Sequence, residues 1–225
     1  MFSTKEKLQK KTGPDGVGRF EYLQMLINEY CTTKSRDAKE QVLANLANFA
    51  YDPINYEYLW RLKILDIFFS ALNESNSKLV SFAAGGICNI CLDPLSQKWM
   101  YRTEKIDVVS SLLKRSEESV VLSAITTLYY LDRPESRGKI SSPENVKIML
   151  EHAKSPNRRI KNLANIFLHD LCGLRVNQQS SNQQPQSSKS STQVSSASSK
   201  SNKISLDKNI AAKNFVQGQN LSSSK

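Results

Sequence analysis

The side chains best suited to chemistry in this sequence are two cysteines in a C-x-x-C spacing, Cys88 and Cys91, and a later pair, His169 and Cys172. Two thiolates with this spacing can form a redox site. Together with a histidine and another cysteine they can also complete a four-ligand zinc set. These four residues define the first hypotheses for a reactive or metal-binding site.

The helices that would carry these side chains repeat along the chain. The segment 44–53, ANLANFAYDP, returns 41 residues later as 85–94, GGICNICLDP, so that Asn, Asp and Pro recur in step. A third copy covers 124–131, and a fourth, spaced one residue shorter, covers 164–171. Self-similarity at about 40 residues on a helical apolar pattern is typical of armadillo and HEAT repeats. The sequence therefore predicts an all-α, armadillo/HEAT-like right-handed α-solenoid of about four repeats, with a disordered C-terminal tail.

This architecture separates the four candidate ligands. Cys88 and Cys91 fall at the end of a repeat helix, whereas a redox site would need them at its start. The His169–Cys172 pair lies two repeats further on, and stacked helices are about 10 Å apart, so the two pairs would be roughly 20 Å apart. That distance exceeds any metal–ligand bond. We therefore expect buried structural thiols, and we predict neither a metal site nor a cofactor.

No other pattern indicates catalysis. The chain has no G-x-x-x-x-G-K-[ST] phosphate loop, no G-x-S-x-G elbow and no H-E-x-x-H motif. Its two histidines, His152 and His169, are interpreted as ordinary surface or packed residues. Because a repeat solenoid usually provides a binding surface, the sequence favours a protein that is not an enzyme.

Composition divides the chain into three parts. Residues 17–172 are rich in Leu, Ile, Ala and Tyr and form the expected armadillo-repeat domain. Residues 173–225 are rich in Ser, Gln, Asn and Lys. They cannot bury enough apolar surface to offset the entropy of ordering, so we expect them to be disordered. Residues 1–16 are expected to be a flexible basic N-terminus.

The positive charge lies mostly in the two ends. Of a net charge of +10, the tail contributes seven Lys or Arg against one Asp, and four lysines lie between Lys5 and Lys11. Such ends can contact RNA weakly or act as solubilising spacers, and both interpretations stay open. Neither a secretory signal nor an apolar run of about 18 residues is present, so we expect no membrane contact. Four cysteines without such a signal favour a reducing compartment, the cytoplasm or the nucleus.

Helix starts are marked by capping residues. Four polar residues that precede a proline predict N-caps, because proline fits the first turn of a helix: Asp52, Asp93, Ser142 and Ser155. The segment 37–40, DAKE, predicts a capping box that opens the helix of the first copy.

Two glycines, Gly85 and Gly86, interrupt the helix of the second copy. Each costs about 1 kcal/mol relative to alanine in a helix interior. The equivalent residues of other copies are also small, which favours close packing between helices as the reason. Close approach of a partner to bare backbone is the alternative.

The expected binding surface is the groove lined by the third helix of each repeat. Asn48 and Asn89 occupy one column of this groove, and a carboxamide can hold an extended peptide because it both donates and accepts hydrogen bonds. The column continues with Tyr130 and Asp170, so such a ladder would be confined to its N-terminal half. No Trp stands four residues before these positions, which argues against binding of basic nuclear-import signals.

Aromatic residues provide a second candidate for partner contact. Phe82, Tyr129 and Tyr130 can form a patch for a folded or helical partner. Phe82 and Tyr129 can equally be core residues between repeats, and the sequence does not separate the two interpretations.

The residues of the first copy also resemble a known family. The run 37–53, DAKEQVLANLANFAYDP, followed by 55–59, NYEYL, is similar to the armadillo repeat-containing protein 7 family. The segments 121–128, VLSAITTL, and 162–168, NLANIFL, share this similarity. The resemblance covers roughly residues 17–172 and does not include the tail. It implies a small armadillo protein of the minor spliceosome, paired with an RNA-recognition-motif protein that attends the capped end of a small nuclear RNA.

The implied function is a nuclear, non-enzymatic protein-binding scaffold in the splicing of minor-class introns, within a spliceosomal ribonucleoprotein. By the same resemblance, Asn45, Asn48, Tyr51 and Tyr56 can face the partner, although both tyrosines can also pack at the repeat junction. Two alternatives stay open: an RNA-contacting accessory factor that uses the basic termini, and a general armadillo adaptor unrelated to splicing. We expect charged replacements of Asn48 and Asn89 to release the partner and to leave the melting temperature nearly unchanged.

Overall fold

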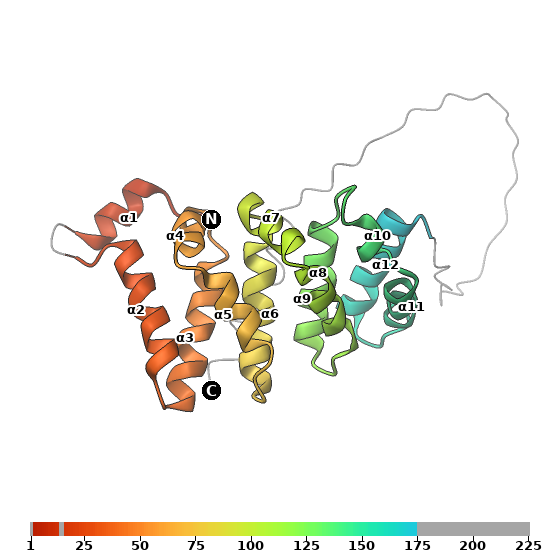
Figure 1. The fold of residues 1–225 in the computed structure, drawn as a ribbon, viewed down its shortest axis with the longest axis horizontal. Helices are drawn as coiled ribbons and strands as arrows, with labels where there is room; N and C mark the ends of the chain where they lie inside the picture. The colour runs from red at the N-terminus through yellow and green to blue at the C-terminus, as the bar shows by residue number, and fades with distance from the viewer. Residues whose placement is uncertain (1, 14–15, 175–225) are drawn as a thin grey trace, which may run out of the picture. The chain divides into compact units, whose positions relative to one another are not determined.

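Helices are the only regular elements in the part of the chain that the structure describes (Figure 1). The computed structural model describes residues 2–13 and 16–174, which belong to one compact unit. Apart from residues 173 and 174, the tail expected to be disordered lies outside them. None of the described helices is by itself long and apolar enough to cross a bilayer. The helices α6 (Ser77–Ile90) and α7 (Pro94–Arg102) meet these criteria only as a pair, and the chain bends by 116° between them.

Four groups of three helices follow one another, as the sequence repeat predicts. The elements in chain order are α1 (Lys5–Thr12), α2 (Arg19–Thr32), α3 (Arg36–Phe49), η1 (Pro53–Asn55), α4 (Tyr56–Arg61), α5 (Ile64–Ala71), α6 (Ser77–Ile90), α7 (Pro94–Arg102), α8 (Lys105–Ser111), η2 (Leu112–Lys114), α9 (Glu118–Tyr130), α10 (Arg137–Ile140), α11 (Pro143–His152) and α12 (Arg158–Cys172).

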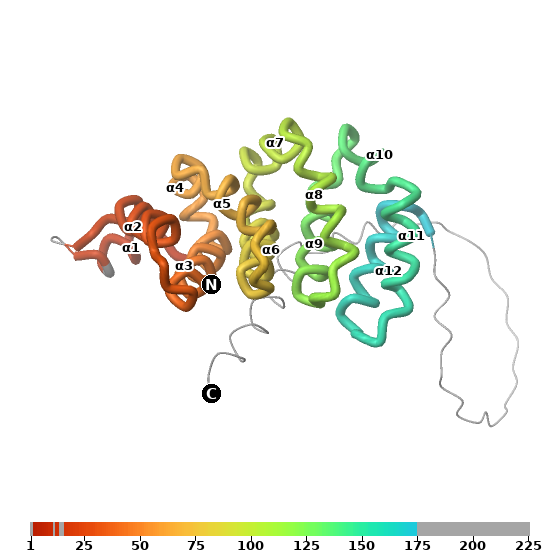
Figure 2. Tube along the Cα trace, turned by 60° about the horizontal axis from the view of Figure 1, so that its bottom comes forward, coloured from red at the N-terminus to blue at the C-terminus, as the bar shows by residue number. Residues whose placement is uncertain are grey.

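The last helix of each group packs on the last helix of the next group. α3 contacts α6, α6 contacts α9, and α9 contacts α12, while α2, α5, α8 and α11 each pack on the long helix of their own group. Figure 2 shows α4, α7 and α10 along one edge of this row and α3, α6, α9 and α12 along the other. The predicted all-α solenoid of four repeats is confirmed.

Three of the four predicted N-caps mark the starts of short helices. The side chains of Asp52, Asp93 and Ser142 each accept a hydrogen bond from a backbone N–H of the first turn, and proline follows in each case. These caps satisfy N–H groups that have no partner inside the helix. Asp52 and Asp93 start the first helix of their groups, whereas Ser142 starts the second helix of the last group.

Two predicted helix starts are wrong. α12 is capped by Asn157, whose side-chain oxygen accepts from two backbone N–H groups, and Ser155 lies outside the helix. α3 is capped by Ser35, whose hydroxyl accepts from the N–H of Ala38, so residues 37–40 lie inside the helix and form no capping box. In both cases a second residue with capping ability stood within two positions of the predicted one.

The basic N-terminus, expected to be flexible, contains the helix α1. The hydroxyl of Thr4 caps it by accepting a hydrogen bond from the N–H of Lys7. Its sequence, KEKLQKKT, has one apolar residue, Leu8, which is half-buried. With so short an apolar pattern the sequence gives no periodic signal for this helix.

Among the described residues, two that are not glycine have a left-handed backbone, and they occupy the same place in successive repeats. Lys63 (φ 54°) precedes α5, and Glu104 (φ 55°) precedes α8. Both positions join the first helix of a repeat to its second helix. The conformation is therefore a property of the repeat junction rather than of one special site.

The core runs through all four groups, and close packing explains one of the two glycines. Phe68 on α5 and Phe167 on α12 are among the largest fully buried side chains. A Cβ atom at Gly86 would lie 2.5 Å from the ring of Phe68, so the packing interpretation is confirmed there. A Cβ atom at Gly85 would meet nothing within 4 Å, so packing does not explain that glycine.

A nearly buried carboxylate joins the first two repeats. Glu40 on α3 accepts hydrogen bonds from Asn76 Nδ2 (2.7 Å), Lys78 Nζ (2.9 Å) and Arg36 Nε (3.0 Å). Asn76 is also the N-cap of α6. The bonds from Asn76 and then Lys78 lower the pKa of Glu40 from 4.5 to about 2. The charged form of Glu40 therefore stabilises the start of α6 against α3.

Replacing Glu40 by glutamine is expected to lower stability at neutral pH and to matter less in acid. Because the folded-state pKa is depressed to about 2, the contribution of Glu40 is present above pH 4.5 and is lost as the pH falls towards 2. Urea unfolding midpoints of the wild type and Glu40→Gln measured from pH 7 to pH 2 should converge in acid. A difference between the two proteins that stays constant over this range would contradict the assignment.

Candidate protein-binding groove

The Asn column changes in exposure along the row of long helices. Asn48, near the end of α3, is exposed, and Asn89, near the end of α6, is half-buried. Tyr130, at the end of α9, is 9% exposed, and Asp170 on α12 is exposed. Equivalent positions of the repeat therefore have different environments, and the surface they form is not a uniform ladder.

Asn89 and Tyr56 are brought together as a link between the first two repeats. Asn89 Nδ2 donates to the backbone oxygen of Ala47 on α3 (2.9 Å), and the Tyr56 hydroxyl donates to the backbone oxygen of Asn89 (3.3 Å). Burial raises the pKa of Tyr56, which keeps this hydroxyl protonated as a donor. The Asn89 donor is thus engaged within the fold.

The predicted aromatic patch is partly buried. Burial raises the pKa of Tyr130 to about 12, and its ring centroid lies 5.8 Å from that of Tyr129. The Tyr129 hydroxyl donates to Asp170 Oδ2 (2.9 Å), which joins α9 to α12. Phe82 is half-buried on α6. These side chains contribute to the contacts between repeats, so they present only part of their surface to a partner.

Three predicted residues meet at the N-terminal end of the row. Asn45, Asn48 and Tyr51 line a cavity of about 340 Å³, together with side chains from the N-terminal segment and from α2. The N-terminal segment lies against this site: the rings of Phe2 and Tyr51 are 5.6 Å apart, and the N–H of Ser3 donates to Asp52 Oδ2 (2.9 Å). We call the cavity and its lining residues the N-terminal cavity.

Cys88 and Cys91 do not have the environment of a reactive thiol pair. Cys88 and Cys91 are both buried, and Cys91 Sγ donates to the backbone oxygen of Cys88 (3.0 Å). Burial raises the pKa of Cys88 to about 12 and that of Cys91 well above its usual range, so both thiols stay protonated. The prediction of buried structural thiols is confirmed for Cys88 and Cys91, whereas Cys172 is half-buried. Within residues 2–13 and 16–174, no group of three or more His, Cys, Asp or Glu side chains could hold a metal ion.

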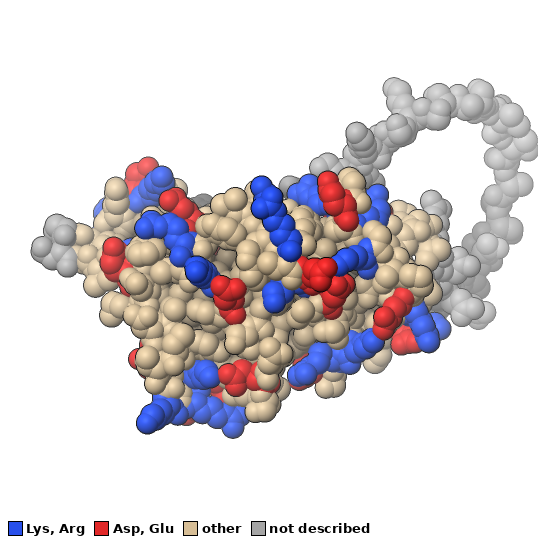
Figure 3. Space-filling view, viewed as in Figure 1, with Lys and Arg blue, Asp and Glu red and all other residues tan. Residues whose placement is uncertain are grey.

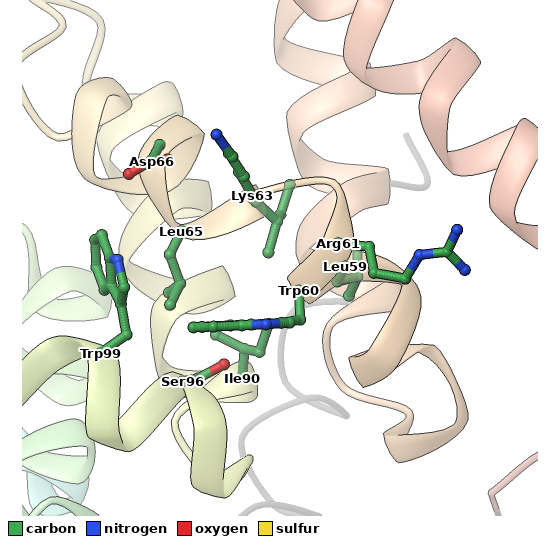
Figure 4. Close-up of a pocket in the computed structure, with 10 residues that line it drawn as sticks. Leu59, Trp60, Arg61, Lys63, Leu65, Asp66, Ile90, Ser96 and Trp99 are labelled. Carbon is green, nitrogen blue, oxygen red and sulfur yellow. The ribbon is translucent and has the colours of Figure 1, made fainter.

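A second cavity, which the sequence reasoning did not predict, is lined by both tryptophans of the chain. Trp60 on α4 and Trp99 on α7 line a space of about 440 Å³ between the second and third repeats. Figure 4 shows the indole of Trp60 lying above Ile90 and Ser96, and the indole of Trp99 across the cavity from Trp60. Spacing along the sequence gave no sign of this pair, because the two tryptophans occupy different positions of the repeat.

Solved structures with a similar fold include designed armadillo repeat proteins and other engineered proteins, and no family model matches the chain. An engineered protein has a TM-score of 0.59 at 17% identity, over 67% of this chain and 62% of its own length. A computationally designed armadillo repeat protein for modular peptide recognition has a TM-score of 0.57 at 15% identity, over 64% of this chain and 62% of its own. The fold is therefore that of an armadillo-repeat α-solenoid.

A curated relative identifies the family. Armadillo repeat-containing protein 7 of Mus musculus is 63% identical to this chain over 158 residues, which cover 69% of this chain and 80% of the relative. This chain belongs to the armadillo repeat-containing protein 7 family. The resemblance noted in the first repeat copy is thereby confirmed.

Proposed function

We propose that this chain is a non-enzymatic nuclear scaffold of the minor spliceosome that binds an RNA-recognition-motif protein at the N-terminal end of its row of long helices. Membership of the family supports the class of function, and the resemblance described above supplies the splicing role. The observation that carries the choice of surface is the N-terminal cavity, where the exposed Asn48 lies beside the half-buried Asn45 and Tyr51.

This cavity suits recognition of a polypeptide. A carboxamide can donate to and accept from a backbone peptide group, and the Tyr51 ring offers an apolar contact beside it. Arg19 contributes a cation to the lining, and its guanidinium lies 4.9 Å from the centre of the Phe49 ring. The partner would contact the N-terminal segment at Phe2 and Ser3 or displace it, because that segment lies against the same residues.

Affinity purification of the tagged full-length chain from nuclear extract tests this function. We expect an RNA-recognition-motif protein and a minor-class small nuclear RNA to copurify with the wild type. Replacing the exposed Asn48 by aspartate should reduce the recovered protein by about tenfold, since the side chain loses its donor and gains a charge in the cavity. Recovery of this protein class at the wild-type level with Asn48→Asp, or its absence from both samples, would contradict the proposal.

The same experiment distinguishes direct RNA binding by the basic ends from direct protein binding by the scaffold. Lys5 and Lys10 are exposed on α1, and phosphate contacts of this kind weaken steeply with salt. If RNA bridges the components, ribonuclease treatment or Lys5→Glu with Lys10→Glu should release the partner. If the scaffold contacts the protein directly, the complex should survive ribonuclease and remain sensitive to Asn48→Asp.

A further inference from the structure

The tryptophan cavity has an apolar floor and a polar mouth. Leu59, Ile64, Leu65 and Ile90 line it and are fully or almost fully buried, whereas Trp60 and Trp99 are half-buried. Lys63 and Asp66 lie at its edge (Figure 4). A space of about 440 Å³ with this lining is of the size and polarity that small binding sites have in proteins.

The next repeat junction has polar contacts at the positions that correspond to the two tryptophans. Forty-one residues after Trp60 stands Tyr101, whose hydroxyl donates to the backbone oxygen of Leu131 (2.7 Å). Forty residues after Trp99 stands Lys139, whose Nζ lies 3.2 Å from Asp107 Oδ2 and 3.8 Å from Glu104 Oε1. Glu104 and Asp107 in turn correspond to Lys63 and Asp66. A cavity of about 390 Å³ lies at the third junction as well, but Asp107 and Lys139 are among its lining residues and no aromatic residue is. The third junction therefore has a polar lining where the second has an aromatic one.

The first repeat junction has an aromatic contact at the position that corresponds to Trp99. The residue that corresponds to Trp99 in the second repeat is Tyr58, and its ring centroid lies 6.5 Å from that of Phe20 on α2. The guanidinium of Arg61 lies over the same Phe20 ring, 4.4 Å from its centroid. The second junction has a contact of the same kind, since the Trp99 ring centroid lies 5.7 Å from that of Phe69 and Lys105 Nζ lies 5.2 Å from the centre of the Phe69 ring. It differs in the cavity beside this contact, which both tryptophans line.

The charge around the open cavity is positive. Lys63 lines it, and Lys105 Nζ lies 5.9 Å from the centre of the Trp99 ring, against one carboxylate, Asp66. The guanidinium of Arg61 points away from the cavity towards Phe20 (Figure 4). None of these four side chains forms an ion pair with another residue of the described ranges. Figure 3 shows this face, with an uncharged area between α4–α5 and α7 and cationic side chains on both sides of it.

We propose that this cavity is a docking site for an acidic peptide segment of a partner protein, which inserts one large apolar side chain between Trp60 and Trp99. The aliphatic floor and the two indoles take the apolar side chain. Neighbouring Asp or Glu residues of the peptide pair with Lys63 and Lys105 at the mouth. The site is separate from the N-terminal cavity, since α4, α5 and α7 build it.

The lining favours a peptide over an RNA base. Reading a base requires hydrogen-bond donors and acceptors that face its edge. The buried hydroxyl of Ser96 is the polar group nearest the floor, and it already donates to Asp93 Oδ2 (2.7 Å). The basic tail of the chain itself is disfavoured by charge, because it carries seven Lys or Arg and one Asp.

Selection of a phage-displayed random dodecapeptide library on the immobilised full-length chain tests the site. Enriched peptides should carry Asp or Glu around one large apolar residue. Because both tryptophans line this cavity, binding of the synthetic peptide should change their fluorescence emission. A peptide with alanine in place of the apolar residue should bind at least about tenfold more weakly by fluorescence anisotropy of a labelled copy.

The chain offers a matched variant, called the closing variant below, that replaces the aromatic lining of the cavity with the polar residues of the third junction. Trp60→Tyr, Lys63→Glu and Trp99→Lys together install the residues of the third junction, where the fold already accommodates them. This variant should keep the wild-type circular dichroism and lose peptide affinity at least about tenfold. Lys63→Glu alone should weaken binding, whereas Lys147→Glu, the same charge change at an exposed position of α11, should not.

Four results would overturn the proposal: enriched peptides that are basic, enriched peptides that leave the tryptophan emission of the wild type unchanged, undiminished affinity of the labelled peptide in the closing variant, or labelled oligouridylate that binds the wild type and loses affinity in that variant by fluorescence anisotropy. A closing variant that alters the sedimentation of the full-length chain would assign the cavity to a second copy instead, and would likewise overturn it. Asn48→Asp should leave peptide affinity unchanged, so failure of this site and failure of the proposed function are distinguishable.

Discussion

Replacing Gly86 by alanine is expected to destabilise the chain by about 1–3 kcal/mol, whereas replacing its neighbour Gly85 is expected to stabilise it by up to about 1 kcal/mol. Both glycines are buried within α6, and alanine has the same intrinsic advantage over glycine at both. They differ in what a Cβ atom would meet: the Phe68 ring at 2.5 Å for Gly86, and nothing within 4 Å for Gly85. Phe68 is fully buried, so its ring has no open space to move into.

Urea denaturation of the two single variants measures this difference, and a double variant tests its cause. Phe68→Leu removes the outer ring atoms that the new methyl group would meet, at its own cost in packing. In that background Gly86→Ala should cost less than it does in the wild type, which a double-mutant cycle detects. Equal effects of Gly85→Ala and Gly86→Ala would show that helix propensity, and not the Phe68 contact, governs both positions.

Replacing Asn89 by aspartate is expected to destabilise the chain by about 1–3 kcal/mol, whereas Asn48→Asp is expected to change stability by less than about 0.5 kcal/mol. Asn89 Nδ2 donates to the backbone oxygen of Ala47, and aspartate would place an acceptor against that acceptor. Asn48 is exposed. The sequence-based expectation that charge at both positions leaves the melting temperature unchanged is therefore replaced, for Asn89, by an expected loss of stability.

Thermal unfolding followed by circular dichroism, together with partner recovery, measures the two roles. Asn48→Asp should lose the partner at an unchanged melting temperature, and Asn89→Asp should lower the melting temperature. Asn89→Leu is a useful control, because it removes the donor without adding a charge and should be less harmful than aspartate. If Asn89→Asp melts at the wild-type temperature, the bond to Ala47 contributes nothing measurable between the first two repeats.

The repeat architecture was predictable because it rests on local patterns. Apolar residues at helical spacing, and caps such as Asp52 and Asp93 before proline, act over a few residues and recur in each copy. The errors at Asp37 and Ser155 have the same origin. Several nearby residues had the chemistry to cap, and the one with the right backbone geometry could not be read from the sequence.

The candidate sites were only partly predictable, because they depend on contacts between repeats. Asn48 and Asn89 are equivalent in sequence, yet α6 brings Asn89 against α3, while Asn48 lies at the end of the row beside the N-terminal segment. The sequence did not predict α1, because its one apolar residue, Leu8, gives no periodic pattern. Leu8 lines the N-terminal cavity together with residues of α3, which lie far away in the sequence. Exposure of a repeated position is thus a property of its neighbours.

By itself the sequence determined the all-α repeat, its register of about 41 residues, the family and the buried thiols, since each follows from short-range pattern or similarity. Only the tertiary structure decided which positions of the register face solvent. It also brought Trp60 and Trp99 to one cavity, although they lie in different repeats and at different positions of the repeat. The physical reason is that stacking sets the distance between elements of adjacent repeats, and side-chain contacts between repeats form only across that distance.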